Sequence, residues 1–170
     1  YLTRKYEALA GVVISASHNP IEYNGIKFFN SNGFKLNDKI EEEMEKIILE
    51  NEEISSRPIK GDIGKIIWGK EAFRDYMEYL KTTIDIDLSG VKVAVDCGNG
   101  ALSKIAPELL KEMGADIIVV NDKPNGVNIN LKCGSTNPDI IKTLVLETKA
   151  DIGLSFDGDA DRIIAVDEMG

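Results

Sequence analysis

The residues best suited to chemistry are three aspartates, Asp157, Asp159 and Asp161, which alternate with the small residues Gly158 and Ala160. Small spacers let the backbone curl, so the three carboxylates can converge on one point. Without a cation this is unfavourable, because two unit charges about 4 Å apart repel by about 4 kcal/mol at an effective dielectric constant of about 20. A divalent cation removes the repulsion, and a few oxygen ligands that leave positions open for water or phosphate suit Mg²⁺. The spacing therefore predicts a magnesium-binding loop.

Two other interpretations of this acidic stretch stay open. It can be a solvated surface turn that binds no metal. It can also be a calcium loop of the EF-hand type, since acids stand at positions 1, 3 and 5 from Asp157 and Glu168 stands at position 12. That motif needs glycine at position 6, where this chain has Arg162, and it needs flanking helices where the sequence predicts strands.

A second candidate is the serine loop, Ser15-Ala16-Ser17-His18-Asn19-Pro20, which follows a predicted strand. A serine hydroxyl there can act as a nucleophile or carry a phosphate, although a polar turn explains the same residues. A phosphoserine carries about −1.5 to −2 charges at pH 7. A metal on the aspartates could bind its oxygens during transfer. Lys27 could serve as general acid/base or phosphate ligand, or be an exposed strand lysine.

A third motif, Gly98-Asn99-Gly100, lies between a predicted strand and a predicted helix, where a dinucleotide-binding fingerprint would stand. The third glycine of that fingerprint is replaced by Ser103. We therefore interpret the motif as a tight strand-to-helix turn whose N–H groups could still cradle an anion.

Hydrophobic periodicity predicts the elements that must position these loops. A buried strand is expected over 11–15 and another strand over 26–29. An amphipathic helix over 38–51 has Ile40, Met44, Ile47 and Ile48 on one face, with Asp38 and Glu41 in a capping-box arrangement. A second helix is expected over 70–83. Beyond residue 90 strands and helices alternate, with strands over 91–95, 115–120, 151–156 and 162–166 and helices over 101–113 and 138–148. This alternation predicts an α/β fold with mixed, largely parallel sheets and flanking helices.

The composition excludes several classes of protein. The 170 residues carry a net charge of −9, which is opposite to the basic surface of a nucleic-acid-binding protein. No apolar run approaches the roughly 20 residues of a membrane span. Two cysteines, Cys97 and Cys133, and one histidine, His18, argue against a disulfide framework and a thiolate or multi-histidine metal site.

The polar stretch over 51–62 suggests a domain boundary, giving segments 1–61 and 62–170. The sequence starts at Tyr1 without a signal-peptide pattern and stops at Gly170 directly after a predicted strand. We expect it to be a piece of a longer cytoplasmic protein.

Taken together, the motifs Ser-Ala-Ser-His-Asn-Pro, Asn-Gly-Ile-Lys and Asp-Gly-Asp-Ala-Asp-Arg, in this order and spacing, resemble the α-D-phosphohexomutases. The stretch 126–138, Gly-Val-Asn-Ile-Asn-Leu-Lys-Cys-Gly-Ser-Thr-Asn-Pro, resembles the bacterial branch that acts on glucosamine phosphates. The resemblance implies a four-domain protein, of which this chain holds the later part of domain 1 and most of domain 2.

The resemblance also implies roles for individual residues. Ser17 corresponds to the serine that carries phosphate in the active enzyme. One Mg²⁺ per active site would be held by Asp157, Asp159 and Asp161, with the oxygen on Ser17 as a further ligand. Lys27 corresponds to the general acid/base, and His18 and Arg162 to neighbouring active-site residues.

The implied reaction interconverts glucosamine 6-phosphate and glucosamine 1-phosphate through a hexosamine 1,6-bisphosphate that acts as intermediate and activator. It would supply UDP-N-acetylglucosamine and so peptidoglycan precursors. The protein would bind a small-molecule hexosamine phosphate and would bind neither nucleic acid nor a membrane. A homodimer is one expectation for the full-length protein.

Two alternatives remain: a mutase for mannose or glucose phosphates, or a non-catalytic metal- or sugar-phosphate-binding module. Since the sequence shows no basic cluster for a second phosphate, we expect the chain alone to be inactive.

Overall fold

A computed structural model of the protein describes residues 1–50 and 57–170. The chain forms two compact units. The first contains Tyr1–Val12 and Lys27–Tyr76, and the second contains Val13–Ile26 and Met77–Gly170. The serine loop therefore belongs to the same unit as the aspartates. The segments that precede and follow it along the chain, up to Val12 and from Lys27, belong to the first unit.

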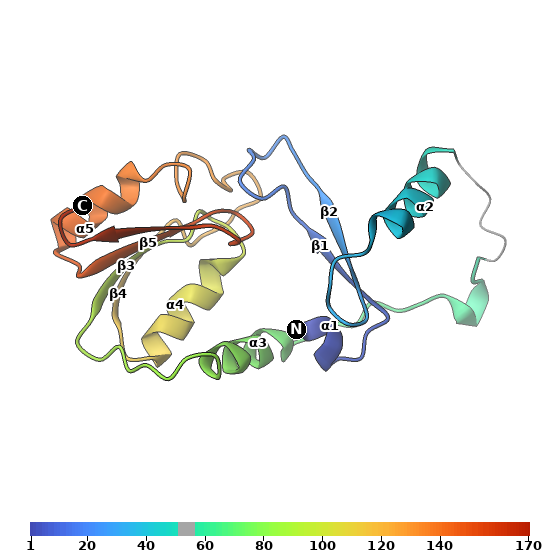
Figure 1. Ribbon diagram of the computed structural model, residues 1–170, viewed down its shortest axis with the longest axis horizontal. Coiled ribbons are helices and arrows are strands. Elements are labelled where there is room, and N and C mark those ends of the chain that lie inside the picture. The colour runs from blue at the N-terminus through green and yellow to red at the C-terminus, as the bar shows by residue number, and fades with distance from the viewer. Residues whose placement is uncertain (51–56) are drawn as a thin grey trace. The chain divides into compact units, whose positions relative to one another are not determined.

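The second unit is built on a four-stranded sheet with the order β4-β3-β5-β6 (Figure 1). Its strands are β3 (Lys92–Asp96), β4 (Asp116–Val120), β5 (Ile152–Phe156) and β6 (Ile163–Asp167). β3 pairs in parallel with both β4 and β5, and β6 pairs antiparallel with β5. The predicted largely parallel sheet is thus confirmed, with one antiparallel strand at its edge.

Two helices cover opposite faces of this sheet: α4 (Leu102–Glu112) and α5 (Asp139–Thr148). On one face, Val93 and Val95 of β3 pack in one cluster with Ala106 of α4. On the other face, Ala94 packs with Ile141 and Val145 of α5. Because successive strand residues point to opposite faces, this alternation explains why β3 is apolar at three consecutive positions.

The sheet brings two of the candidate loops to one edge. β3 and β5 run in parallel, with Asp96 opposite Ser155, so the chain leaves both strands in the same direction. β3 leads through α4 to β4 on one side, whereas α5 leads to β5 on the other side. The carboxyl ends of β3 and β5 therefore flank a topological switch point, the usual binding position in open α/β sheets.

The first unit contains α1 (Leu2–Lys5), α2 (Asp38–Leu49) and the short 3₁₀ helix η1 (Lys60–Asp62). β1 (Ala10–Ile14) and β2 (Ile26–Asn30) pair as a two-stranded sheet, and α3 spans Ala72–Lys81. Both strands and α3 cross from one unit into the other. The predicted helices and strands are confirmed, apart from shifts of one to two residues at their ends.

Two local predictions here are wrong. The strand expected to be buried is β1, yet Val12 is 54% and Ile14 70% exposed. Its sheet has two strands in the described part of the chain, so its apolar side chains stay open to solvent. The cap of α2 is Asn37 rather than Asp38: its extended backbone lets the side chain accept a hydrogen bond from the Ile40 N–H at 3.0 Å.

The predicted boundary between segments 1–61 and 62–170 stays a prediction. Residues 51–56, which are part of the stretch that suggested it, and Asn51 at the end of the predicted first helix, lie outside the described residues. Within 1–50 and 57–170, every helix is too short or too polar to cross a membrane.

Candidate active site

The loop that carries the three aspartates connects β5 to β6, and the ends of the two strands pair at Phe156 and Ile163. The Ala160 N–H donates to the Asp157 carbonyl at 3.1 Å, which closes a turn. Ala160 adopts a left-handed backbone with φ +61°, a conformation that is unfavourable in free energy for a residue with a Cβ atom. Strands on both sides of the loop exclude the EF-hand interpretation, which requires helices.

The three carboxylates converge as predicted. Each offers an oxygen, and the three oxygens lie within 4.8 Å of one another. Asp157 is fully buried, Asp159 is half-buried and Asp161 is exposed, so the cluster opens toward solvent on one side. Three carboxylate oxygens that leave one side of the site open to water or phosphate fit the coordination of Mg²⁺.

Asp157 links this loop to the serine loop and to Arg162. The Ser17 hydroxyl donates to Asp157 Oδ2 at 3.1 Å, and Arg162 Nε donates to the same oxygen at 3.1 Å. The Arg162 backbone N–H donates to Oδ1 at 3.2 Å. Arg162 also lies 3.7 Å from Asp161, so its guanidinium group offsets part of the repulsion within the cluster.

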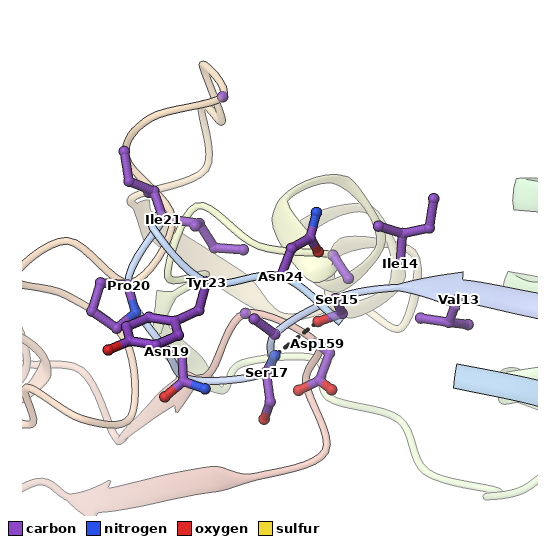
Figure 2. A pocket seen from close by; sticks show the side chains of 15 residues that line it. Val13, Ile14, Ser15, Ser17, Asn19, Pro20, Ile21, Tyr23, Asn24 and Asp159 are labelled. Atoms are coloured by element: carbon purple, nitrogen blue, oxygen red, sulfur yellow. Dashed lines mark hydrogen bonds between the residues drawn. The ribbon is translucent and has the colours of Figure 1, made fainter. Parts of the chain in front are cut away.

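The serine loop is held in an uncommon conformation. Ser17 has φ +55°, in the left-handed region that few non-glycine residues adopt. Its N–H donates to Ser15 Oγ at 3.0 Å, and its carbonyl accepts a hydrogen bond from Asn130 Nδ2 at 2.9 Å. In Figure 2 the Ser17 hydroxyl and the Asp159 carboxylate point to the same side of the loop. Both line a cavity of about 550 Å³.

Gly158 allows the two loops to approach closely. A Cβ atom at this position would lie 2.5 Å from the Ser17 carbonyl oxygen and 2.8 Å from Asn130 Nδ2. On its other side, the Gly158 carbonyl accepts a hydrogen bond from the Ala101 N–H at 2.8 Å. Its predicted role is that of a small spacer that lets the aspartate loop curl, and the structure adds that the absence of a side chain allows Ser17 to reach Asp157.

The glycine turn after β3 uses its backbone N–H groups for hydrogen bonds within the protein. The Gly98 N–H donates to Asp96 Oδ1, and the Asn99 N–H donates to the Asn121 carbonyl. The N–H groups of Gly100 and Ala101 donate to the carbonyls of Cys97 and Gly158. Because these four N–H groups have partners within the protein, they are not available for the anion that the turn could have cradled, and the predicted tight turn is confirmed.

A buried carboxylate fixes this turn. Asp96 is fully buried and accepts hydrogen bonds from the N–H groups of Gly98 and Gly134 at 3.0 and 2.8 Å. It also accepts one from Asn121 Nδ2 at 2.9 Å and a longer one from the Ser155 hydroxyl at 3.5 Å. These bonds join β3, β5 and the segment around Gly134 beneath the site.

The structure brings together five of the seven predicted site residues: Ser17, Asp157, Asp159, Asp161 and Arg162. His18 is exposed on the serine loop directly after Ser17. Lys27 lies in β2 and belongs to the first unit. The roles of His18 and Lys27 therefore stay predictions. Sequence reasoning missed Asn130, which it used only as part of a branch motif.

Comparison with known sequences identifies the family. Residues 1–55 match the profile described as phosphoglucomutase/phosphomannomutase, alpha/beta/alpha domain I, and residues 74–170 match that of domain II. The chain belongs to the phosphoglucomutase/phosphomannomutase family. The resemblance inferred from the serine and aspartate motifs is thereby confirmed.

Curated relatives within this family carry a more specific name. The chain is 61% identical over its whole length to the phosphoglucosamine mutase of Alkaliphilus metalliredigens and 55% identical to that of Acetivibrio thermocellus. It spans 38% of the length of each of these relatives.

Solved structures of the family share the fold. A Burkholderia thailandensis protein of the phosphoglucomutase/phosphomannomutase family superposes with a TM-score of 0.71 at 27% identity, covering 95% of this chain and 34% of that one. The N-acetylphosphoglucosamine mutase of Aspergillus fumigatus superposes with a TM-score of 0.60 at 22% identity, covering 96% of this chain and 44% of that one. That structure contains GlcNAc-6P and magnesium.

Proposed function

We propose that the protein containing this chain interconverts glucosamine 6-phosphate and glucosamine 1-phosphate through a phosphate carried on Ser17. The observation that carries the proposal is the 3.1 Å hydrogen bond from the Ser17 hydroxyl to Asp157, within a cluster of three converging carboxylates. The choice of glucosamine rather than glucose or mannose rests on the names of the relatives that are 51–61% identical.

The proposed chemistry divides among the residues of this chain. The bond between phosphorus and Ser17 Oγ breaks while a sugar hydroxyl oxygen bonds to the phosphorus. The sugar hydroxyl gives its proton to a base, for which we propose Lys27. The Ser17 oxygen takes up a proton from water, and Lys27 releases its proton to water. The resulting 1,6-bisphosphate reorients in the active site and returns its other phosphate to Ser17, so the enzyme ends in its starting state.

Three aspartates and one serine would form the magnesium site of this reaction. Asp157, Asp159 and Asp161 would hold Mg²⁺ together with an oxygen of the phosphate on Ser17. When bound, the ion would supply positive charge against the negative charge of the transferred phosphoryl group. Arg162 holds the buried Asp157 in place by two hydrogen bonds, and we assign His18 to the rim beside Ser17.

The chain alone is expected to be inactive, because reorienting a bisphosphate requires a second phosphate site opposite Ser17. The relatives are more than twice as long as this chain, and we propose that the part they have in addition supplies that site. The proposal places the reaction in the cytoplasm on the route to UDP-N-acetylglucosamine, with the full-length protein as a homodimer.

The decisive experiment is a mutase assay on the full-length protein with Mg²⁺ and a trace of sugar bisphosphate. Glucosamine, glucose and mannose 6-phosphates are compared as substrates for the wild type and for Ser17→Ala. Ser89→Ala is the matched control, since its hydroxyl bonds to exposed Asp87. We expect preference for glucosamine phosphate, loss of activity in Ser17→Ala, and wild-type activity in Ser89→Ala.

Each other outcome has a definite meaning. Preference for another hexose phosphate keeps the mechanism and changes the branch. Activity that survives Ser17→Ala refutes the phosphoserine mechanism. A wild type without turnover, and without phosphate on Ser17 by mass spectrometry, supports the non-catalytic binding module instead.

A further inference from the structure

Asn130 stands out as a buried polar residue with no assigned role. It is 9% exposed and has φ +55°, so its side chain is nearly out of water and its backbone is in the left-handed region. Its Oδ1 atom is buried, and no hydrogen-bond donor in the described parts of the chain reaches it. Stability alone does not favour a buried side chain with an unused acceptor, because the lost contact with water is not replaced.

The other end of the Asn130 side chain is fully used. Nδ2 donates to the Ser17 carbonyl at 2.9 Å and to the Asn19 carbonyl at 3.3 Å, two acceptors on the serine loop more than 100 residues away in sequence. Because both acceptors are carbonyls, only a donor can stand there, and this fixes which end of the amide faces the loop.

The hydrogen bond from Asn130 to Ser17 acts on a residue whose backbone conformation is itself unfavourable. Ser17 itself has φ +55°, a conformation that persists only where the surroundings hold it. Asn130 donates a hydrogen bond to the Ser17 carbonyl, and Ser15 Oγ accepts one from the Ser17 N–H. The Ser17 hydroxyl then reaches Asp157 at 3.1 Å.

We propose that Asn130 is a positioning residue that holds Ser17 in its left-handed conformation and thereby aims the Ser17 oxygen at the aspartate cluster. Asn130 touches the backbone of Ser17 and not its hydroxyl, so it acts through the loop. The activity part of this inference rests on the proposed function, whereas the loop conformation does not.

Asn130→Asp is the sharpest variant. Aspartate has the same shape and also tolerates the left-handed region, but a carboxylate faces the two carbonyls with acceptors only. Asn130→Gly keeps the backbone freedom and removes the amide. Asn128→Asp is the matched control, because the Asn128 side chain bonds to Lys123 and Asn125 within its own loop.

The test uses the full-length protein and two measurements. Hydrogen–deuterium exchange compares the segment 13–26 with the core strands β3 and β5 in the absence of substrate. Steady-state kinetics give kcat and KM for glucosamine 6-phosphate. For both Asn130 variants we expect faster exchange in 13–26, unchanged exchange in β3 and β5, and a kcat lowered about 10- to 100-fold with KM within about threefold.

The contrary results are distinct. Wild-type exchange in 13–26 for both Asn130 variants overturns the inference, whether or not the protein is a mutase. So does a loss of protection spread evenly over the core, which would show a merely structural role. If the wild type shows no mutase activity, the proposed function fails, and the exchange measurement alone then decides the positioning role.

Discussion

Replacing Gly158 by alanine tests whether close packing of the two loops sets the geometry of the site. The φ of Gly158 lies outside the left-handed range, so alanine strains no backbone angle there, and its effect is steric. The added Cβ would lie 2.5 Å from the Ser17 carbonyl oxygen and 2.8 Å from both Asn130 Nδ2 and Ile129 Cδ1.

The expected size of the effect follows from these distances. To reach an ordinary contact of 3.4 Å, the Ser17 carbonyl must retreat by about 0.9 Å. A shift of that size takes the 3.1 Å bond between Ser17 and Asp157 beyond hydrogen-bonding range. Overpacking of this kind costs about 1–3 kcal/mol of folding stability, and a misplacement near 1 Å lowers turnover by about 100-fold.

The assay measures urea denaturation and kcat on the full-length protein. Gly64→Ala is the matched control, since a Cβ there meets no atom within 4 Å and its backbone is not left-handed. If Gly158→Ala turns over like the wild type while Gly64→Ala behaves as expected, the two loops do not need their close contact, and the argument from packing is refuted.

Three further predictions concern the metal loop and the cysteines. Asp159→Asn should weaken Mg²⁺ binding at least about tenfold by isothermal titration while leaving thermal unfolding close to wild type; unchanged affinity would place the metal elsewhere. Ala160→Gly should keep or raise the free energy of unfolding by up to about 1 kcal/mol, because glycine relieves the left-handed φ of +61°, whereas Ala106→Gly in the interior of α4 should lower it by at least about 0.5–1 kcal/mol. Burial raises the pKa of the Cys97 thiol to about 12 and that of Cys133 to about 11, from an ordinary 9.0. Both thiols should therefore resist Ellman's reagent at pH 8 until the protein unfolds, and stability should fall above about pH 9, where the unfolded thiols ionise first.

Local sequence patterns predicted much of the second unit. β3 combines an apolar run with a following glycine turn, and the alternation of strands and helices after it specifies a parallel sheet. The convergence of Asp157, Asp159 and Asp161 could also be predicted, because their spacing lies within a single loop.

Features that depend on distant parts of the chain could not be predicted in this way. The acceptors of Asn130 lie 111 and 113 residues away, and nothing in its neighbouring sequence indicates them. The exposure of β1 depends on how many strands join its sheet, which the apolar run Val12-Val13-Ile14 does not encode. The N–H groups of the glycine turn, which could have cradled an anion, donate partly to residues on other elements, such as Gly158.

The separation of the serine loop from its partners has a consequence for synthesis on the ribosome. Ser17 is made 140 residues before Asp157 and 113 before Asn130. At about 5–20 residues per second, roughly 7–28 s pass before the chain contains the carboxylate that the Ser17 hydroxyl meets. Until Asn130 has been made the loop has neither of these two partners, and until Asp157 has been made it still lacks the carboxylate. The nascent chain therefore carries a serine whose working conformation can form only after most of the second unit has been translated.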